Sequence, residues 1–115
     1  MIMLEKTFKI KRDKYKSARG GYSRLLNLHC RKCDYVFAVY QKDGSGNLRR
    51  MYMDRILSPE YLVGLENKNI EDIEPIRCQN CNFLVAMPFI YEKENRKAFR
   101  VFQDAVIKRI KKIDK

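Results

Sequence analysis

The sequence predicts a small α+β protein in which antiparallel β-hairpins are joined by a four-cysteine site and followed by a C-terminal amphipathic helix. Three observations predict this fold class. The four cysteines form two CxxC pairs, runs of aromatic and β-branched residues surround both pairs, and the residues from 92 onward are rich in helix formers. A chain of 115 residues is expected to form one domain with one modest core.

The N-terminal segment of about residues 9–21 is expected to be a basic arm. It reads KIKRDKYKSARGG, which is polar, positively charged and interrupted by glycines. Residues 22–29 then become apolar enough for a strand that leads into the first cysteine pair. The first residues have neither the long apolar stretch nor the small-residue cleavage site of a secretory signal, and no apolar run is long enough to span a membrane. We therefore expect a cytoplasmic protein.

The middle of the chain is expected to consist mostly of β-structure. YVFAVYQ (35–41) and LRRMYMDRI (48–56) flank the glycine-rich KDGSGN, and this arrangement predicts a hairpin. The serine and proline at 58–59 are typical of a helix start, so a short helix or turn is expected up to about residue 67. FLVAMPFIY (83–91) follows the second cysteine pair as a strand, and Pro88 within it indicates an edge or a bulge.

The last element is expected to be an amphipathic helix over about residues 92–113. Its sequence is rich in glutamate, lysine, arginine and alanine, which favour helices. The apolar residues recur at spacings of three and four, which places them on one helical face. This stripe consists of Phe99, Phe102, Val106, Ile110 and Ile113.

The four cysteines are expected to bind one structural zinc ion. Each pair has the two-residue spacing that lets both thiolates of a tight turn reach one tetrahedral ion, about 2.3 Å from each sulfur. The two pairs supply a complete four-thiolate shell: Cys30, Cys33, Cys78 and Cys81. A redox pair or disulfide and an iron centre are the alternatives, although a thioredoxin-like enzyme would need a βαβ unit that is not visible here. His29 is expected to point to the opposite face of its strand and is not assigned as a ligand.

The 44 residues between the pairs exceed the about 15 to 20 of a compact zinc ribbon. This separation fits two hairpins that each carry one pair, with the metal joining two sheets. In the four cysteines and the strands beside them, the chain resembles the β-tent class of zinc proteins. That class includes guanine-nucleotide-exchange-type chaperones, zinc-bearing methionine sulfoxide reductases, yippee and cereblon domains, and the RNA-sensing domains of antiviral helicases. The chain lacks the reductases' additional catalytic cysteine and the tryptophans of the yippee and cereblon pocket. Of the class's activities, RNA binding is the one that suits the basic ends of this chain.

The net charge of +11 lies at the two ends of the chain. Residues 1–34 carry ten basic and three acidic side chains, residues 93–115 carry nine and three, and residues 35–92 carry six and eight. Basic ends around a nearly neutral middle favour a surface directed at a polyanion. The predicted phosphate contacts come from both ends: Lys9, Lys11, Arg12, Lys14, Lys16, Arg19, Arg96, Lys97, Arg100, Lys108, Lys111 and Lys112.

Nucleic-acid binding is therefore the predicted function. RNA or ribonucleoprotein is favoured over duplex DNA because no recognition-helix motif is visible. The alternative is a protein-interaction adaptor that places the apolar stripe of its C-terminal helix in a partner's groove. An enzyme is not expected, because the single histidine and the scattered carboxylates form no recognisable acid–base pair.

Overall fold

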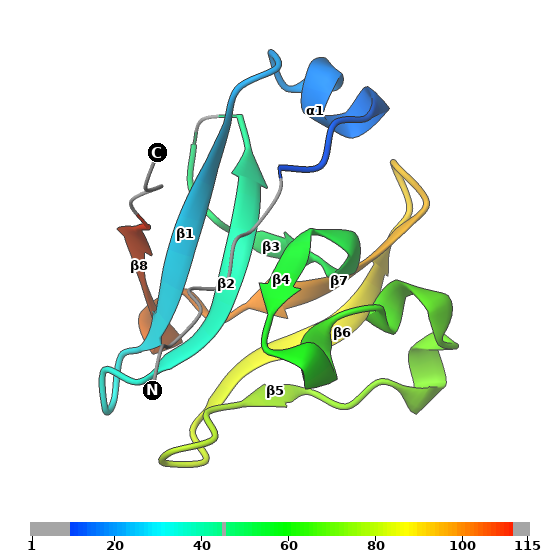
Figure 1. Cartoon of the computed structure of the whole chain (residues 1–115). Helices are drawn as coiled ribbons and strands as arrows, with labels where there is room; N and C mark the ends of the chain where they lie inside the picture. Colours follow the sequence, from blue (N-terminus) through cyan, green and yellow to red (C-terminus); the bar gives the residue numbers. More distant parts are fainter. Residues whose placement is uncertain (1–9, 45, 112–115) are drawn as a thin grey trace, which may run out of the picture.

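The computed structural model describes residues 10–44 and 46–111 (Figure 1). The described chain forms two four-stranded antiparallel sheets, one five-residue α-helix and short 3-10 helices. The first sheet has the order β4-β2-β1-β8, and the second has the order β3-β7-β6-β5. Among these residues no helix is both long and apolar enough to cross a bilayer.

The chain passes several times from one sheet to the other. The first sheet consists of β1 (Ser23–Cys30), β2 (Val36–Asp43), β4 (Ile56–Ser58) and β8 (Val106–Ile110). The second consists of β3 (Arg50–Tyr52), β5 (Ile76–Arg77), β6 (Leu84–Tyr91) and β7 (Arg96–Val101). The helices are α1 (Lys14–Ala18), η1 (Met53–Arg55), η2 (Glu60–Leu62), η3 (Leu65–Asn67), η4 (Ile70–Asp72) and η5 (Gln103–Ala105).

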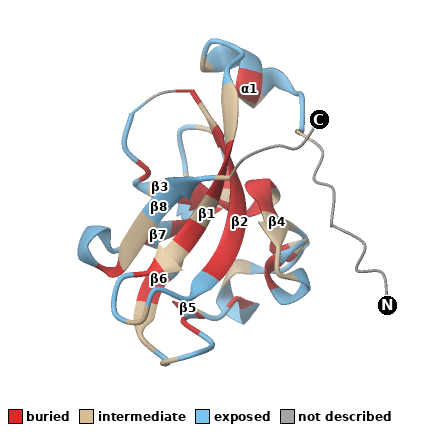
Figure 2. Ribbon diagram, turned by 60° about the vertical axis from the view of Figure 1, so that its left-hand side comes forward, coloured by how far each residue is buried: buried red, intermediate tan, exposed pale blue. Residues whose placement is uncertain are grey.

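The hydrophobic core is built from both sheets. Leu28 of β1, Tyr40 of β2, Met51 of β3, Val85 of β6 and Phe99 of β7 are all buried in one cluster. Figure 2 shows buried segments along β1 and β2. Full burial of a side chain of this size contributes roughly 1.5 to 3 kcal/mol, so these contacts account for much of the cohesion between the sheets.

The C-terminal helix predicted over about residues 92–113 is wrong, and so is the α+β class. Residues 92–95 form a turn, after which β7, η5 and β8 follow. Phe99 and Val101 are buried in the core at the two-residue spacing of a strand, whereas Phe102, which completed the helical stripe, is 40% exposed. The adaptor function that depended on this helix is therefore not supported.

The strands predicted at 22–29, 35–41 and 83–91 correspond to β1, β2 and β6, but the run 48–56 is not one strand, because η1 separates β3 from β4. The hairpin expected between 35–41 and 48–56 does not form, because β3 pairs with β7 in the second sheet and β2 pairs with β1 and β4. The short helix or turn expected from residue 58 to about residue 67 corresponds to η2 and η3. The predicted arm contains α1, which Asp13 caps by accepting hydrogen bonds from the backbone N–H groups of Tyr15 and Lys16.

Candidate functional site

The two CxxC turns have the same backbone geometry. The first turn joins β1 to β2, and the second joins β5 to β6. In each turn the N–H of the first cysteine donates to the carbonyl oxygen five residues later over 2.8 Å. The N–H of the residue four positions later donates back to the carbonyl of the first cysteine over 2.7 Å. Two equivalent turns, one on each sheet, therefore present their thiols to each other.

The residue after the second cysteine of each turn has a left-handed backbone. Asp34 has φ 66° and Asn82 has φ 65°, and Asp and Asn are the non-glycine residues that tolerate this region best.

We expect Asn82→Val to destabilise the protein by about 1 to 2 kcal/mol, because a β-branched side chain clashes with the backbone in this conformation. Asn82→Gly is the matched control and is expected to be tolerated. Thermal melts of the two variants measure the difference. Equal melting temperatures for the valine and glycine variants would contradict the assigned turn geometry.

The four Sγ atoms lie within 4.8 Å of one another. The Sγ of Cys30 is 3.6 Å from that of Cys81, and the Sγ of Cys33 is 3.5 Å from that of Cys78. Four sulfurs around a tetrahedral zinc, each about 2.3 Å from it, would be about 3.8 Å apart. The sulfurs are too far apart for disulfides, and all four cysteines are free thiols. Cys30, Cys33, Cys78 and Cys81 could therefore bind one metal ion, and His29 is not part of this cluster.

The thiols do not share one pKa in the absence of metal. The hydrogen bond with the Asn80 side chain, helped by the backbone of Tyr35, lowers the pKa of Cys33 to about 6. The backbone hydrogen bond at Phe83 lowers the pKa of Cys81, but burial and the three neighbouring thiols outweigh it and raise this pKa to about 12. The cluster without metal therefore retains protons, and binding of a metal must release them.

Two basic residues of the predicted arm, Lys11 and Lys16, are hydrogen-bonded within the described structure. The backbone N–H of Lys11 donates to Oε1 of Gln41 over 2.6 Å, and Nε2 of Gln41 donates to the carbonyl of Lys11 over 2.9 Å. The ammonium group of Lys16 donates to the carbonyl of Gly21. Arg12 and Lys14 are exposed, while Lys9 lies outside the described residues.

A buried arginine anchors this segment. Arg55 is 1% exposed, and it donates to Asp13 over 2.5 Å and to Asp43 over 2.8 Å. Asp43 also accepts hydrogen bonds from Ser23 over 2.6 Å and from Gln41 over 2.8 Å. The negative charge of Asp43 is therefore balanced by the buried guanidinium of Arg55.

Arg96 is not a surface residue. It is 5% exposed, and its guanidinium carbon lies 3.9 Å from the ring centre of Tyr15 and 3.8 Å from that of Tyr52. It also donates to Asp54 over 2.6 Å. This stack fastens α1 to the second sheet, so Arg96 has a structural role that its position in a basic segment did not reveal.

The other predicted residues of the C-terminal segment are separated. Lys97 donates to the carbonyl oxygens of residues 66 and 68, over 2.9 Å and 2.5 Å. Arg100 on β7 and Lys108 on β8 are exposed on different sheets. Lys111 is half-buried, and its N–H donates to the carbonyl of Leu25, while Lys112 lies outside the described residues.

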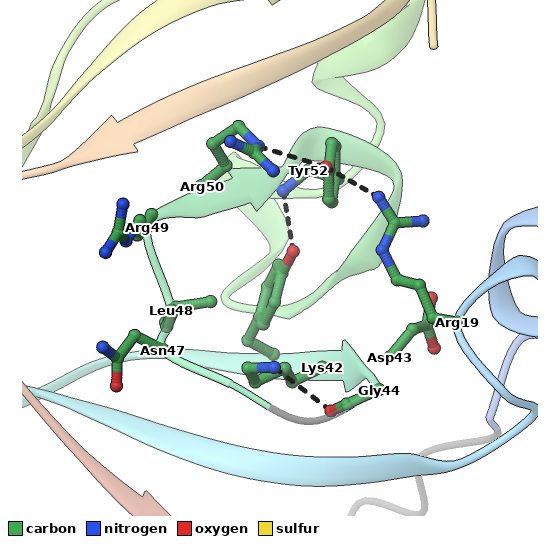
Figure 3. A pocket seen from close by; sticks show the side chains of 10 residues that line it. Arg19, Lys42, Asp43, Gly44, Asn47, Leu48, Arg49, Arg50 and Tyr52 are labelled. Carbon is green, nitrogen blue, oxygen red and sulfur yellow. Dashed lines mark hydrogen bonds between the residues drawn. The ribbon is translucent and has the colours of Figure 1, made fainter. Parts of the chain in front are cut away.

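A cationic pocket lies beside the glycine-rich loop (Figure 3). It has a volume of about 330 Å³. Arg19 and Arg50 both donate to the Tyr52 hydroxyl, over 2.9 Å and 3.2 Å, and Figure 3 shows this hydroxyl between the two guanidinium groups. The pocket is lined by Arg19, Tyr40, Lys42, Asp43, Gly44, Asn47, Leu48, Arg49, Arg50 and Tyr52.

The positive charge of this pocket exceeds what its single carboxylate can balance. Four lining residues are cations, of which Arg19 is paired with Glu94 over 2.6 Å. Asp43 is already bonded to Arg55, so Arg49 and Arg50 have no counter-ion among the lining residues. Burial lowers the pKa of Lys42, and repulsion by Lys108, Arg24 and Arg19 lowers it further. An anion placed in the pocket would relieve this repulsion.

Only Arg19 of the pocket cations was among the predicted phosphate contacts. Lys42, Arg49 and Arg50 surround the glycine-rich loop, and from the sequence this local cluster already indicates a turn that could touch a partner. They were not among the predicted phosphate contacts because they lie in a segment with more acids than bases.

Comparison of the chain with protein-family models, with curated proteins and with solved structures found no match in any of the three. The functional argument therefore depends on the geometry of the cysteine cluster and of the cationic pocket.

Proposed function

We propose that this chain is a small structural-zinc protein that binds nucleic acid, and RNA or ribonucleoprotein in preference to duplex DNA, without catalysing a reaction. The cysteine cluster supports the zinc assignment because four thiolates in tetrahedral arrangement are the donor set of structural zinc sites. When bound, the ion would join the β1–β2 turn to the β5–β6 turn and so fix the two sheets relative to each other.

The observation that carries the nucleic-acid proposal is the cationic pocket. Phosphate groups provide most of the affinity of nucleic acids for proteins, and arginine and lysine are their usual partners. RNA is favoured because α1, the single α-helix among residues 10–44 and 46–111, has five residues and is bonded to the body of the protein. A helix that reads the major groove of DNA must be free to enter it.

The test is the salt dependence of binding to an unstructured RNA, measured by fluorescence anisotropy. If the four pocket cations each contact a phosphate, log Kd should change with log salt with a slope of magnitude about 3, so that binding weakens about fifty-fold between about 50 mM and about 200 mM salt. Arg49→Gln should weaken binding and reduce this slope by about 1.

Arg77→Gln is the matched control. It makes the same charge change on β5, at the opposite edge of the sheet from β3. Binding that does not depend on salt would contradict the proposal, as would an equal loss of affinity in the two variants.

A further inference from the structure

The outer face of the second sheet combines arginine with aromatic side chains. Residues directly opposite each other in antiparallel strands project to the same side, so the register of β3, β7 and β6 places their outward side chains in rows. We call these eight positions the arginine–aromatic face: Arg50, Tyr52, Met87, Phe89, Tyr91, Arg96, Ala98 and Arg100. None of the eight is acidic.

One half of this face is covered and the other half is open. Tyr15 packs on Arg96, and both Arg96 and Tyr52 are buried. In the other half, Met87 is 40% exposed, Arg100 is exposed, and Phe89 and Tyr91 are half-buried, with the Tyr91 ring centre 6.0 Å from that of Tyr52. These four side chains are therefore accessible to a ligand.

The open half presents flat π surfaces. The guanidinium carbon of Arg50 lies 4.1 Å from the ring centre of Tyr91, and that of Arg100 lies 4.8 Å from the ring centre of Phe89. Aromatic rings and guanidinium planes both stack on nucleic-acid bases, and such stacking tolerates any sequence because every base has a π face. Phe89 and Tyr91 are two residues apart, about 7 Å along the strand, so each can take a separate base.

The surroundings of the face favour nucleic acid over a peptide. Arg50 belongs to the face and also lines the cationic pocket, so the two surfaces are continuous. Because β5 pairs with residues 84–86 of β6, the segment from Met87 onward runs along the sheet edge. Pro88 in that segment has no N–H to offer to an added peptide strand.

We infer that the open half of the arginine–aromatic face stacks unpaired bases of a strand whose phosphates bind at the cationic pocket, which makes the protein selective for single-stranded nucleic acid. This inference rests on the proposed nucleic-acid function. The bases of a duplex are paired and stacked on one another, so a duplex could use the phosphate contacts alone.

The experiment compares an unstructured RNA of about twelve nucleotides with the same RNA in a duplex, by fluorescence anisotropy at one salt concentration. The wild-type protein should bind the single strand at least about tenfold more tightly. The double variant Phe89→Leu, Tyr91→Leu keeps apolar volume but removes both rings, and it should lose most of this preference with its duplex affinity and salt slope unchanged. Tyr61→Leu removes an exposed aromatic ring beside Cys78, near the start of β6, and should change neither.

A second measurement does not depend on the folding of a variant. A 2-aminopurine base in the single strand should lose fluorescence when the wild-type protein binds, because stacking quenches it. Equal affinity for the two RNAs, or binding without quenching, would overturn the inference and leave the proposed function intact. Failure to bind any RNA at low salt would instead remove the proposed function itself.

Discussion

Replacement of Cys78 by serine is expected to release the metal and unfold the protein at room temperature. Cys78 is 2% exposed, and its Sγ faces the thiols of the other turn. No strand of one sheet pairs with a strand of the other within the described part of the chain. The metal–sulfur bonds would therefore connect the two sheets directly, through their CxxC turns. Structural zinc sites bind with about 10 kcal/mol or more, comparable with the whole stability of a small domain. Circular dichroism melts and elemental analysis measure the two effects.

The control is Tyr61→Leu, which truncates an exposed side chain beside the same turn and is expected to retain about one zinc per chain. A chelator should reproduce the effect of Cys78→Ser on the wild-type protein. A protein purified without added metal that carried well under one zinc per chain, had four reactive thiols and still melted cooperatively would contradict the zinc assignment.

The cysteine cluster could be anticipated from the sequence because its geometry is local. Each CxxC turn is six residues long, and its two hydrogen bonds depend on a left-handed residue that Asp34 and Asn82 can supply. The separation of the pairs then required that the two turns belong to different hairpins, as β1–β2 and β5–β6 do. Short-range rules were sufficient here because the metal site itself supplies the long-range contact.

The C-terminal segment was mispredicted because two periodicities coexist in it. Phe99 and Phe102 fit a helical stripe, but Phe99 and Val101 fit a strand equally well. Helix formers such as lysine and glutamate favoured the prediction of a helix. In the structure the segment forms strands instead, because β7 pairs with β6 and β8 pairs with β1. Asn95, with φ 49°, closes the turn before β7 and was the local signal against a continuous helix.

The charge of a segment does not reveal which of its cations face solvent. Arg55 lies in the nearly neutral middle and Arg96 in the basic end, yet both are buried and both fasten the N-terminal segment. Their partners Asp13, Asp43 and Asp54 are remote in sequence, so these ion pairs depend on the folded topology. Four other cations, Arg19, Lys42, Arg49 and Arg50, line the pocket around the loop after β2.

Arg55→Met is expected to destabilise the protein by about 3 to 5 kcal/mol, because it leaves Asp43 buried without its counter-ion. The side chain of Asp43 is 4% exposed, so water cannot replace the guanidinium. Chemical denaturation measures the loss. Arg77→Met removes an exposed arginine and should change stability by no more than about 0.5 kcal/mol, so a similar loss in both variants would contradict a specific role for the buried pair.

Lowering the pH should reduce the difference in free energy of unfolding between the wild-type protein and Arg55→Met. Burial alone would raise the pKa of Asp43, but hydrogen bonds from Ser23, Arg55 and Gln41 lower it below its ordinary value of 3.8. The hydrogen bond from Arg55 similarly lowers the pKa of Asp13. A carboxylate with a lowered pKa in the folded state stabilises the protein fully above its unfolded pKa, and this stabilisation is lost as the pH falls through the folded pKa. Loss of Arg55 makes the pKa of Asp43 higher in the folded variant than in the folded wild-type protein. The stability difference should therefore be largest near neutral pH and shrink as the pH falls through the Asp43 pKa of the variant toward that of the wild-type protein. The double variant Arg55→Met/Asp43→Asn identifies the cause of the loss. If it is no more stable than Arg55→Met, the loss comes from packing of the arginine stem instead of from the uncompensated charge.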